Sequence, residues 1–186
     1  MSSNIQRKLF SVRDCDRMYE TGILRPSERV ELIRGEIILM MPTGPRHGAA
    51  VDGATRFFVR IAGDDAIVRV QGSVVLDEFC WTHPDVALLR PRADFYVGKN
   101  PAGADVLLII EVADSSLEYD TSVKKEVYAI LGVQEYWVAD LRSNRLLVHR
   151  DPADDEYTSL QEFHRGDVIA PRLLPECRLP VDILLP

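Results

Sequence analysis

The chain has 186 residues, of which 46% are hydrophobic and 27% are charged, a balance that fits one globular domain with its own core. Its formal net charge is −7 and its sequence pI is about 5.1, which argues against a broad, basic nucleic-acid-binding surface but does not exclude a local basic groove. No apolar run approaches the ~20 residues of a membrane span, and residues 1–8 are polar without an apolar signal core. We therefore expect a cytoplasmic protein without a membrane segment.

The first third of the chain predicts a helix, a hairpin and a second helix. In chain order these cover residues 11–19, 29–40 and 47–62. Ser11 is a candidate N-cap of the first helix, and the two alternating runs of the hairpin flank Arg34-Gly35. Apolar residues recur at helical spacing in the third segment until Gly63 ends it.

The middle of the chain predicts strands and one further helix. Strands are expected over residues 66–70, 73–76, 86–89, 106–111, 135–139 and 145–149, with Gly72 as a possible β-bulge. The helix is expected to begin at Asp120 as N-cap and to end at Gly132. Val123, Val127 and Ile130 would form its buried stripe.

The order of these elements predicts a mixed α/β sheet with helices on its faces, preceded by the N-terminal helix and hairpin. The whole chain, residues 1–186, is expected to form a single domain. Its proline-rich tail, residues 166–186, is expected to be irregular and to pack on the surface.

Three cysteines, Cys15, Cys80 and Cys177, are dispersed along the chain without a C-x-x-C spacing. An odd and scattered set is typical of reduced thiols in the cytoplasm, and not of a disulfide framework or a zinc site. Cys80 has no base beside it in the sequence, so we assign it no catalytic role.

Two carboxylates stand beside apolar runs that are typical of buried strands. Asp85 precedes Val86-Ala87-Leu88-Leu89, and Glu111 follows the apolar run 106–110. An unpaired buried charge is costly, so such carboxylates normally have a partner. With Lys124 they could surround a hard cation, or they could form a structural ion pair, and the spacing leaves both interpretations open.

Magnesium suits the first interpretation, because it binds carboxylate, carbonyl and water oxygens and often takes only one or two carboxylates from the protein. Manganese is the alternative metal. Asp85 and Glu111 would be ligands, and the main-chain carbonyl of Val112 could add a third oxygen. Lys124 could orient a metal-bound water or neutralise developing charge. It could equally pair with a carboxylate, or lie exposed beside Lys125.

Other residues could join this site. Glu31 would add a carboxylate, although a solvated strand face is its usual alternative. His47, at the start of a helix, could accept a proton or hold a water or phosphate, or it could satisfy a local hydrogen bond. Arg46 could contact a phosphate or be an ordinary exposed arginine. Asp114-Ser115-Ser116 could orient the carboxylates or form a simple turn.

Several short motifs follow one another between about Glu28 and Arg150. They are Val30-Glu31-Leu32-Ile33-Arg34-Gly35-Glu36, Gly44-Pro45-Arg46-His47-Gly48, Pro84-Asp85-Val86-Ala87, Ile110-Glu111-Val112-Ala113-Asp114-Ser115-Ser116, Lys124 with Tyr128-Ala129, and Gly132-Val133-Gln134-Glu135-Tyr136-Trp137. Each motif is short, but the ordered set resembles the Uma-type restriction endonuclease family of the PD-(D/E)-x-K nuclease superfamily.

This resemblance implies a restriction-endonuclease-like fold and an endonuclease that hydrolyses DNA phosphodiester bonds with magnesium-activated water. By resemblance, Asp85 matches the superfamily aspartate and Glu111 its second acidic residue. Ala113 stands where the superfamily lysine would be. In the Uma-type pattern a lysine from the next helix replaces it, which favours Lys124 and leaves Lys125 as the competitor.

Two alternatives remain beside a DNA endonuclease. One is a catalytically inactive protein on a nuclease fold that binds nucleic acid or another protein, since one fold hosts many functions. The other is a hydrolase of a smaller phosphate ester. We expect a homodimer, because nucleases commonly pair two sites with two strands and closed dimers are the commonest oligomers.

Overall fold

The computed structural model describes residues 6–186, so the first five residues of the expected polar N-terminal segment lie outside the described range. The helices are α1 (Val12–Glu20), α2 (Pro45–Ile61), α3 (Leu117–Tyr119) and α4 (Lys125–Ile130), with a π-helical turn η3 (Asp120–Lys124) before α4 and 3₁₀ turns η1 (Gly63–Asp65), η2 (Gly103–Asp105) and η4 (Val181–Ile183). The strands are β1 (Val30–Ile33), β2 (Glu36–Leu39), β3 (Ile67–Val70), β4 (Val74–Asp77), β5 (Cys80–Thr82), β6 (Val86–Leu89), β7 (Val106–Ala113), β8 (Glu135–Asp140), β9 (Arg145–Ala153), β10 (Glu156–His164), β11 (Val168–Ile169) and β12 (Leu179–Pro180).

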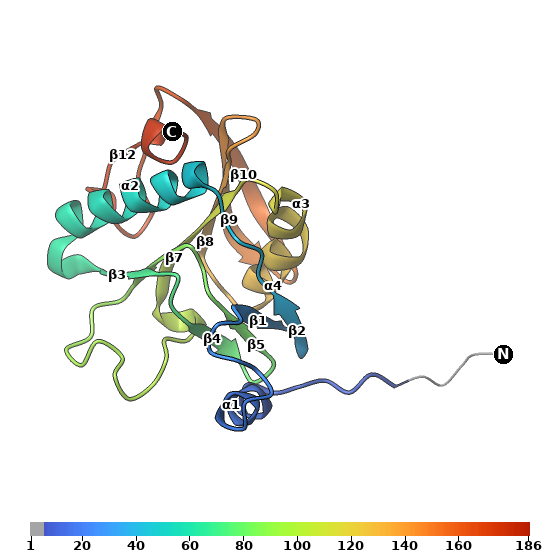
Figure 1. The fold of residues 1–186 in the computed structure, drawn as a ribbon. Coiled ribbons are helices and arrows are strands. Elements are labelled where there is room, and N and C mark those ends of the chain that lie inside the picture. The colour runs from blue at the N-terminus through green and yellow to red at the C-terminus, as the bar shows by residue number, and fades with distance from the viewer. Residues whose placement is uncertain (1–5) are drawn as a thin grey trace.

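The central sheet has six strands in the order β10-β9-β8-β7-β6-β3. Its β7–β8 pair is parallel and is connected through α3, η3 and α4, whereas the other pairs are antiparallel. A smaller sheet has the order β2-β1-β5-β4. Figure 1 shows α2 and the C-terminal segment on one side of the central sheet, α3 and α4 on the other, and α1 beside the smaller sheet. The expected mixed α/β architecture is confirmed.

Successive residues of β7 serve two separate cores. Leu108 and Ile110 join a cluster with α2 and the C-terminal segment. Ile109 and Ala113 join a second cluster with Tyr128 of α4. Because side chains alternate across a strand, Glu111 belongs to the α4 side of the sheet. The strand thus places this carboxylate where the helix that follows β7 can reach it.

The N-terminal helix and hairpin form as expected. Ser11 caps α1 through a capping box, in which its hydroxyl and backbone exchange hydrogen bonds with Asp14. Arg34 and Gly35 both have positive φ angles, of 52° and 77°, as a tight two-residue hairpin turn requires. All four residues of β1 are buried, and the strand lies between β2 and β5 in the smaller sheet.

The helix after β7 differs from the prediction. Asp120 is not an N-cap, because it has helical dihedral angles and begins the π-helical turn, while α3 begins three residues earlier, after Ser116. Val127 is buried as predicted, but Ile130 is 51% exposed. Lys124 and Tyr128, four residues apart on one helical face, are both buried, so the inner face of this segment is not the purely apolar stripe that was predicted.

The C-terminal part of the chain was also predicted incompletely. The tail contains the β11–β12 pair, and Leu179, Val181 and Leu184 are fully buried against α2, so the prediction that it packs on the surface is wrong. The edge strand β10 was not predicted. Gly72 lies in the connection between β3 and β4 and is not a bulge, because these strands belong to different sheets. Within residues 6–186, the structure holds no helix with the length and apolar character needed to cross a bilayer.

His149 on β9 gives the fold a specific acid sensitivity. Its ring is buried and stacks on Tyr136, with ring centroids 5.8 Å apart, and burial lowers its pKa to about 4. Between pH 6.5 and 4 the unfolded chain therefore binds the proton more readily than the native protein, and stability falls as the pH decreases through this window. We expect His149→Phe to recover as much as about 3 kcal/mol of unfolding free energy at pH 4 relative to pH 7. Urea unfolding at both pH values measures this, with the exposed His164→Gln as control; equal pH dependence in His149→Phe and wild type would contradict it.

Candidate active site

Asp85 and Glu111 lie side by side because their strands are neighbours. β6 and β7 pair antiparallel with Val86 opposite Ile110, and the same register places Asp85 opposite Glu111. The backbone N–H of Asp85 donates to Glu111 Oε2 at 3.3 Å. The two carboxylates that are 26 residues apart in the chain therefore meet at one end of the sheet.

Three donors from different elements hold the Asp85 carboxylate. His47 Nε2, in the first turn of α2, lies 2.9 Å from Oδ2, and the backbone N–H of Val112 donates to the same oxygen at 2.9 Å. The side-chain amide of Gln71 donates to Oδ1 at 3.2 Å. Burial by itself would raise the pKa of Asp85, but the hydrogen bond and charge of His47, the Val112 amide and Lys124 together lower it.

Glu111 is held by the helix that follows its own strand. Lys124 Nζ and the Tyr128 hydroxyl both donate to Glu111 Oε1, each at 2.9 Å. Lys124 is the last residue of η3, and Tyr128 lies four positions further along, on the same helical face. Lys125 points away from this site and pairs with Glu156 on β10, so the structure brings Lys124 and not Lys125 to the carboxylates.

Two more carboxylates surround the same ammonium group. Glu31 of β1 is fully buried; its Oε1 lies 3.2 Å from Lys124 Nζ and accepts a hydrogen bond from the backbone N–H of His83 at 2.8 Å. Asp120 Oδ1 lies 4.0 Å from Nζ, and its other oxygen accepts a bond from the Ser116 hydroxyl. Among residues 6–186, Glu31 Oε2 finds no hydrogen-bond donor.

The site therefore carries more negative than positive charge. The carboxylates of Glu31, Glu111 and Asp120 lie within 4.0 Å of the Lys124 ammonium group, and a fourth carboxylate, that of Asp85, lies beside Glu111 and pairs with His47. Burial, and then the charges of the neighbouring carboxylates, raise the pKa of Glu111 to about 8 although Lys124 opposes the shift. The pKa of Asp120 is raised for the same reasons, and that of Lys124 lies well above its ordinary value because these carboxylates outweigh the effect of burial.

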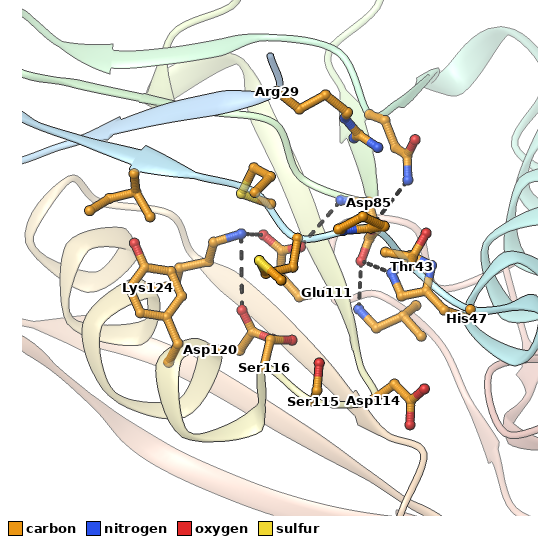
Figure 2. A pocket seen from close by; sticks show the side chains of 18 of the residues that line it. Arg29, Thr43, His47, Asp85, Glu111, Asp114, Ser115, Ser116, Asp120 and Lys124 are labelled. Atoms are coloured by element: carbon orange, nitrogen blue, oxygen red, sulfur yellow. Dashed lines mark hydrogen bonds and ion pairs between the residues drawn. The ribbon is translucent and has the colours of Figure 1, made fainter. Parts of the chain in front are cut away.

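An open cavity of about 290 Å³ reaches this cluster from the surface. Figure 2 shows Asp85, Glu111 and Lys124 across its middle, with Arg29 at one end and Asp114 and Ser115 at the other. The β2 strand and the segment after it supply an apolar wall, in which Leu39 and Met41 are 62% and 75% exposed. The carboxylates and Lys124 are thus buried but not sealed from solvent.

Most of the site residues that were predicted from the sequence lie together in the structure. Asp85, Glu111, Lys124, Glu31 and His47 all belong to one hydrogen-bonded network. Glu31 reaches the network through Lys124 and not as a neighbour of Asp85. Val112 contributes its N–H to Asp85, and the segment 114–116 lines the cavity. Arg46 instead binds the carbonyl of Pro186 and the side chain of Asn144.

Within residues 6–186 there is no cluster of three or more histidine, cysteine, aspartate or glutamate side chains with metal-binding geometry. Asp85 and Glu111 both line the cavity and are joined by a direct hydrogen bond, Asp114 and Asp120 also line it, and Glu31 is not part of the lining. Two carboxylates are still a sufficient protein contribution for magnesium, which keeps several of its waters.

Three contributors were missed in the sequence. Gln71 gave no signal, since a lone glutamine between two strands is unremarkable in sequence, yet its φ of 49° turns the chain toward Asp85. Asp120 was read as a cap, although its spacing of four from Lys124 indicated a shared helical face. Tyr128 is fully buried and its hydroxyl donates to Glu111.

Comparisons with known proteins identify the family and the fold of this chain. The family Uma2, described as "Putative restriction endonuclease", matches residues 13–182. The chain belongs to this family. A crystal structure titled as a putative nuclease belonging to DUF820, from Anabaena variabilis, is similar with a TM-score of 0.67 and 18% sequence identity, over 89% of this chain and 94% of that chain. No curated protein matches. The likeness of the solved structure confirms the expected nuclease-type fold.

Lys124 is expected to be essential for stability, in contrast to its neighbour Lys125. Lys124→Met leaves three buried carboxylates without a cation, so we expect a loss of about 3–5 kcal/mol in the free energy of unfolding at pH 8. The loss should shrink toward pH 5, because the stranded carboxylates then take up protons. Lys125→Met removes only a partly exposed pair and should cost less than about 1 kcal/mol. Urea denaturation of both variants measures this, and equal losses would show that the network does not depend on Lys124.

Proposed function

We propose that this protein is a metal-dependent endonuclease that hydrolyses DNA phosphodiester bonds, with its active site at Asp85 and Glu111. The observation that carries the proposal is the meeting of these two carboxylates in an open cavity, with Lys124 buried directly behind Glu111. Membership of a family described as restriction endonucleases supports the same reaction class.

The excess of carboxylates at this site supports binding of a divalent cation. Burial, and then the neighbouring carboxylates, raise the pKa of Glu111, and a cation beside it would favour its charged form. Asp85 Oδ1 and Glu111 Oε2 each receive a single hydrogen bond from the described residues, which leaves lone pairs for a cation. Magnesium is our first choice and manganese the second, because hard oxygen ligands suit both. Bound there, such an ion would lower the pKa of a water and stabilise charge on a phosphoryl oxygen.

The side chains around the carboxylates have separate roles in this proposal. Lys124 holds Glu111 by its Oε1, so that Oε2 stays turned toward Asp85. His47 fixes Asp85 through Oδ2 and is placed to exchange a proton at the cavity wall. Glu31 anchors Lys124 from behind and does not meet the substrate. This assigns the lysine to positioning and charge balance, because its 2% exposure leaves little access for attack on a solvated phosphate.

The alternative of an inactive binding protein is favoured by one observation, the complete engagement of Lys124 by carboxylates of its own chain. On that reading the network is structural, and the cavity would bind a nucleic acid or a protein without cleaving it. The same site on an active enzyme could also take a smaller phosphate ester. A cleavage assay separates these possibilities.

We expect Asp85→Asn to reduce DNA cleavage at least about 100-fold, because even a residue that only orients a metal ligand costs 10- to 100-fold when changed. The assay uses duplex, single-stranded and branched DNA with magnesium or manganese, and bis(4-nitrophenyl) phosphate as the small ester. Asp52→Asn, on the exposed face of α2, is the matched control and should cleave like wild type. EDTA should abolish cleavage by all of them. Equal cleavage by Asp85→Asn and Asp52→Asn would exclude this site, and cleavage of the small ester alone would exclude DNA as the substrate.

A homodimer remains our proposal for the assembly, because two copies would present two cavities to two strands. Sedimentation equilibrium should give twice the chain mass of 21.0 kDa at micromolar concentration. A mass of one chain over the full concentration range would refute it.

A further inference from the structure

A second cavity, of about 500 Å³, adjoins the candidate active site. Both cavities have Arg29 and Gln71 in their linings, and Gln71 also donates to Asp85. The volume lies within the range of pockets that hold small organic ligands. A ligand that extends from one cavity into the other would therefore pass Arg29 and lie close to the carboxylates.

The lining of the second cavity is aromatic and polar. Tyr19 and Trp81 contribute rings whose centroids are 6.1 Å apart. The indole N–H of Trp81 donates to His83 Nε2 at 3.1 Å, and the Ser73 hydroxyl lies 2.8 Å from the same nitrogen. The two rings are tilted by 52° to each other and Trp81 is 7% exposed, so the half-buried Tyr19 supplies most of the accessible ring surface, with the polar side chain of Asn100 also in the lining. Aromatic surface and hydrogen-bonding groups are the two features that recognise an unstacked base.

Charge in this cavity also distinguishes a base from a phosphate. Asp16 and Glu28 line it, and their carboxylates would accept hydrogen bonds from base amino groups but repel a phosphate. Arg29, at the junction, is exposed, whereas His47 and Lys124 are buried and engaged by carboxylates. Among the described residues that line the two cavities, Arg29 is thus the one cation free to meet a phosphate.

A single free cation does not suit a duplex, which is gripped mainly through many phosphate contacts. Single strands are bound with fewer such contacts because aromatic side chains stack on their bases. The net charge of −7 further favours binding of a single strand over a duplex, since the duplex has the higher density of negative charge and is repelled more strongly.

We propose that the second cavity binds one unpaired nucleobase next to the scissile phosphate, with Arg29 on an adjoining phosphate. The substrate class is then a nucleic acid with at least one unpaired nucleotide at the site of cleavage. The position of the scissile phosphate rests on the proposed nuclease function, but binding of the base does not.

Trp81 allows a test that needs neither metal nor cleavage. A single-stranded hexadeoxynucleotide of mixed sequence, added in EDTA, should quench the Trp81 fluorescence, while Trp137 is fully buried in the core and supplies a constant background. The same sequence as a blunt duplex should bind at least about tenfold more weakly. Trp81→Phe should lose the fluorescence change yet still bind a dye-labelled strand by anisotropy.

Three variants locate the contacts. Arg29→Ala should lower the slope of log K against log salt by about 0.7, as loss of one phosphate contact to a single strand requires. Tyr19→Leu should weaken binding by about fivefold or more through loss of stacking. Arg56→Ala, on the exposed face of α2 and outside both cavities, removes the same charge and should change neither quantity.

Tighter binding of the duplex, equal effects of Arg29→Ala and Arg56→Ala, or binding without any change in Trp81 fluorescence would each overturn the proposal. These outcomes leave the nuclease activity to the cleavage assay. Conversely, binding of the single strand by a protein that cleaves nothing would support the base site and refute the proposed function.

Discussion

The pairing of Lys124 with carboxylates from three directions is the interaction on which the rest of the structure depends. Its ammonium group lies 2.9 Å from Glu111 on the central sheet and 3.2 Å from Glu31 on the smaller sheet. A buried lysine is tolerated only when its charge is matched by close partners. The same contact therefore satisfies the lysine, joins the two sheets and fixes the position of the Glu111 carboxylate. Stability and site geometry cannot be separated at this point of the fold.

A purely structural ion network would be expected to balance its charges, and this one does not. The pKa of Glu111 stays raised beside a lysine, first because the carboxyl is buried and then because Asp85, Asp120 and Glu31 add negative charge around it. Such an imbalance destabilises the folded chain, and groups with strongly perturbed pKa values concentrate at functional sites. The open cavity beside the imbalance distinguishes it from a dry core network, since a cation can enter from solvent to relieve it.

Asp85 and Glu111 could be predicted from the sequence, because each stands beside an apolar run that is typical of a buried strand. The sequence also favoured Lys124 over Lys125, but only through the resemblance to a family, since both lysines have the same local pattern. The contributions of Gln71 and Asp120 were not predicted, for different reasons. Gln71 has a positive φ at a position without a glycine, which the sequence does not indicate. Asp120 was interpreted as an N-cap, although it stands four residues before Lys124 and shares a helical face with it. The buried tail was missed because its prolines are typical of surface segments, while its burial depends on α2, which lies more than 100 residues earlier.

The effect of the acidic composition on nucleic-acid binding depends on the contacts within the site more than on the net charge of the whole surface. A negative protein repels a polyanion at long range, but salt screens this repulsion beyond about 8–10 Å, so short-range contacts decide which nucleic acid can bind. The short-range contacts here are a carboxylate pair suited to a cation, one arginine, and a cavity whose carboxylates accept from base amino groups. The single arginine and the acidic lining of the second cavity disfavour the many phosphate contacts of a duplex, and both are compatible with an unstacked base. The negative charge of the protein then contributes to substrate specificity. It weakens binding of an intact duplex, which depends on many phosphate contacts, more than it weakens binding of a single exposed nucleotide.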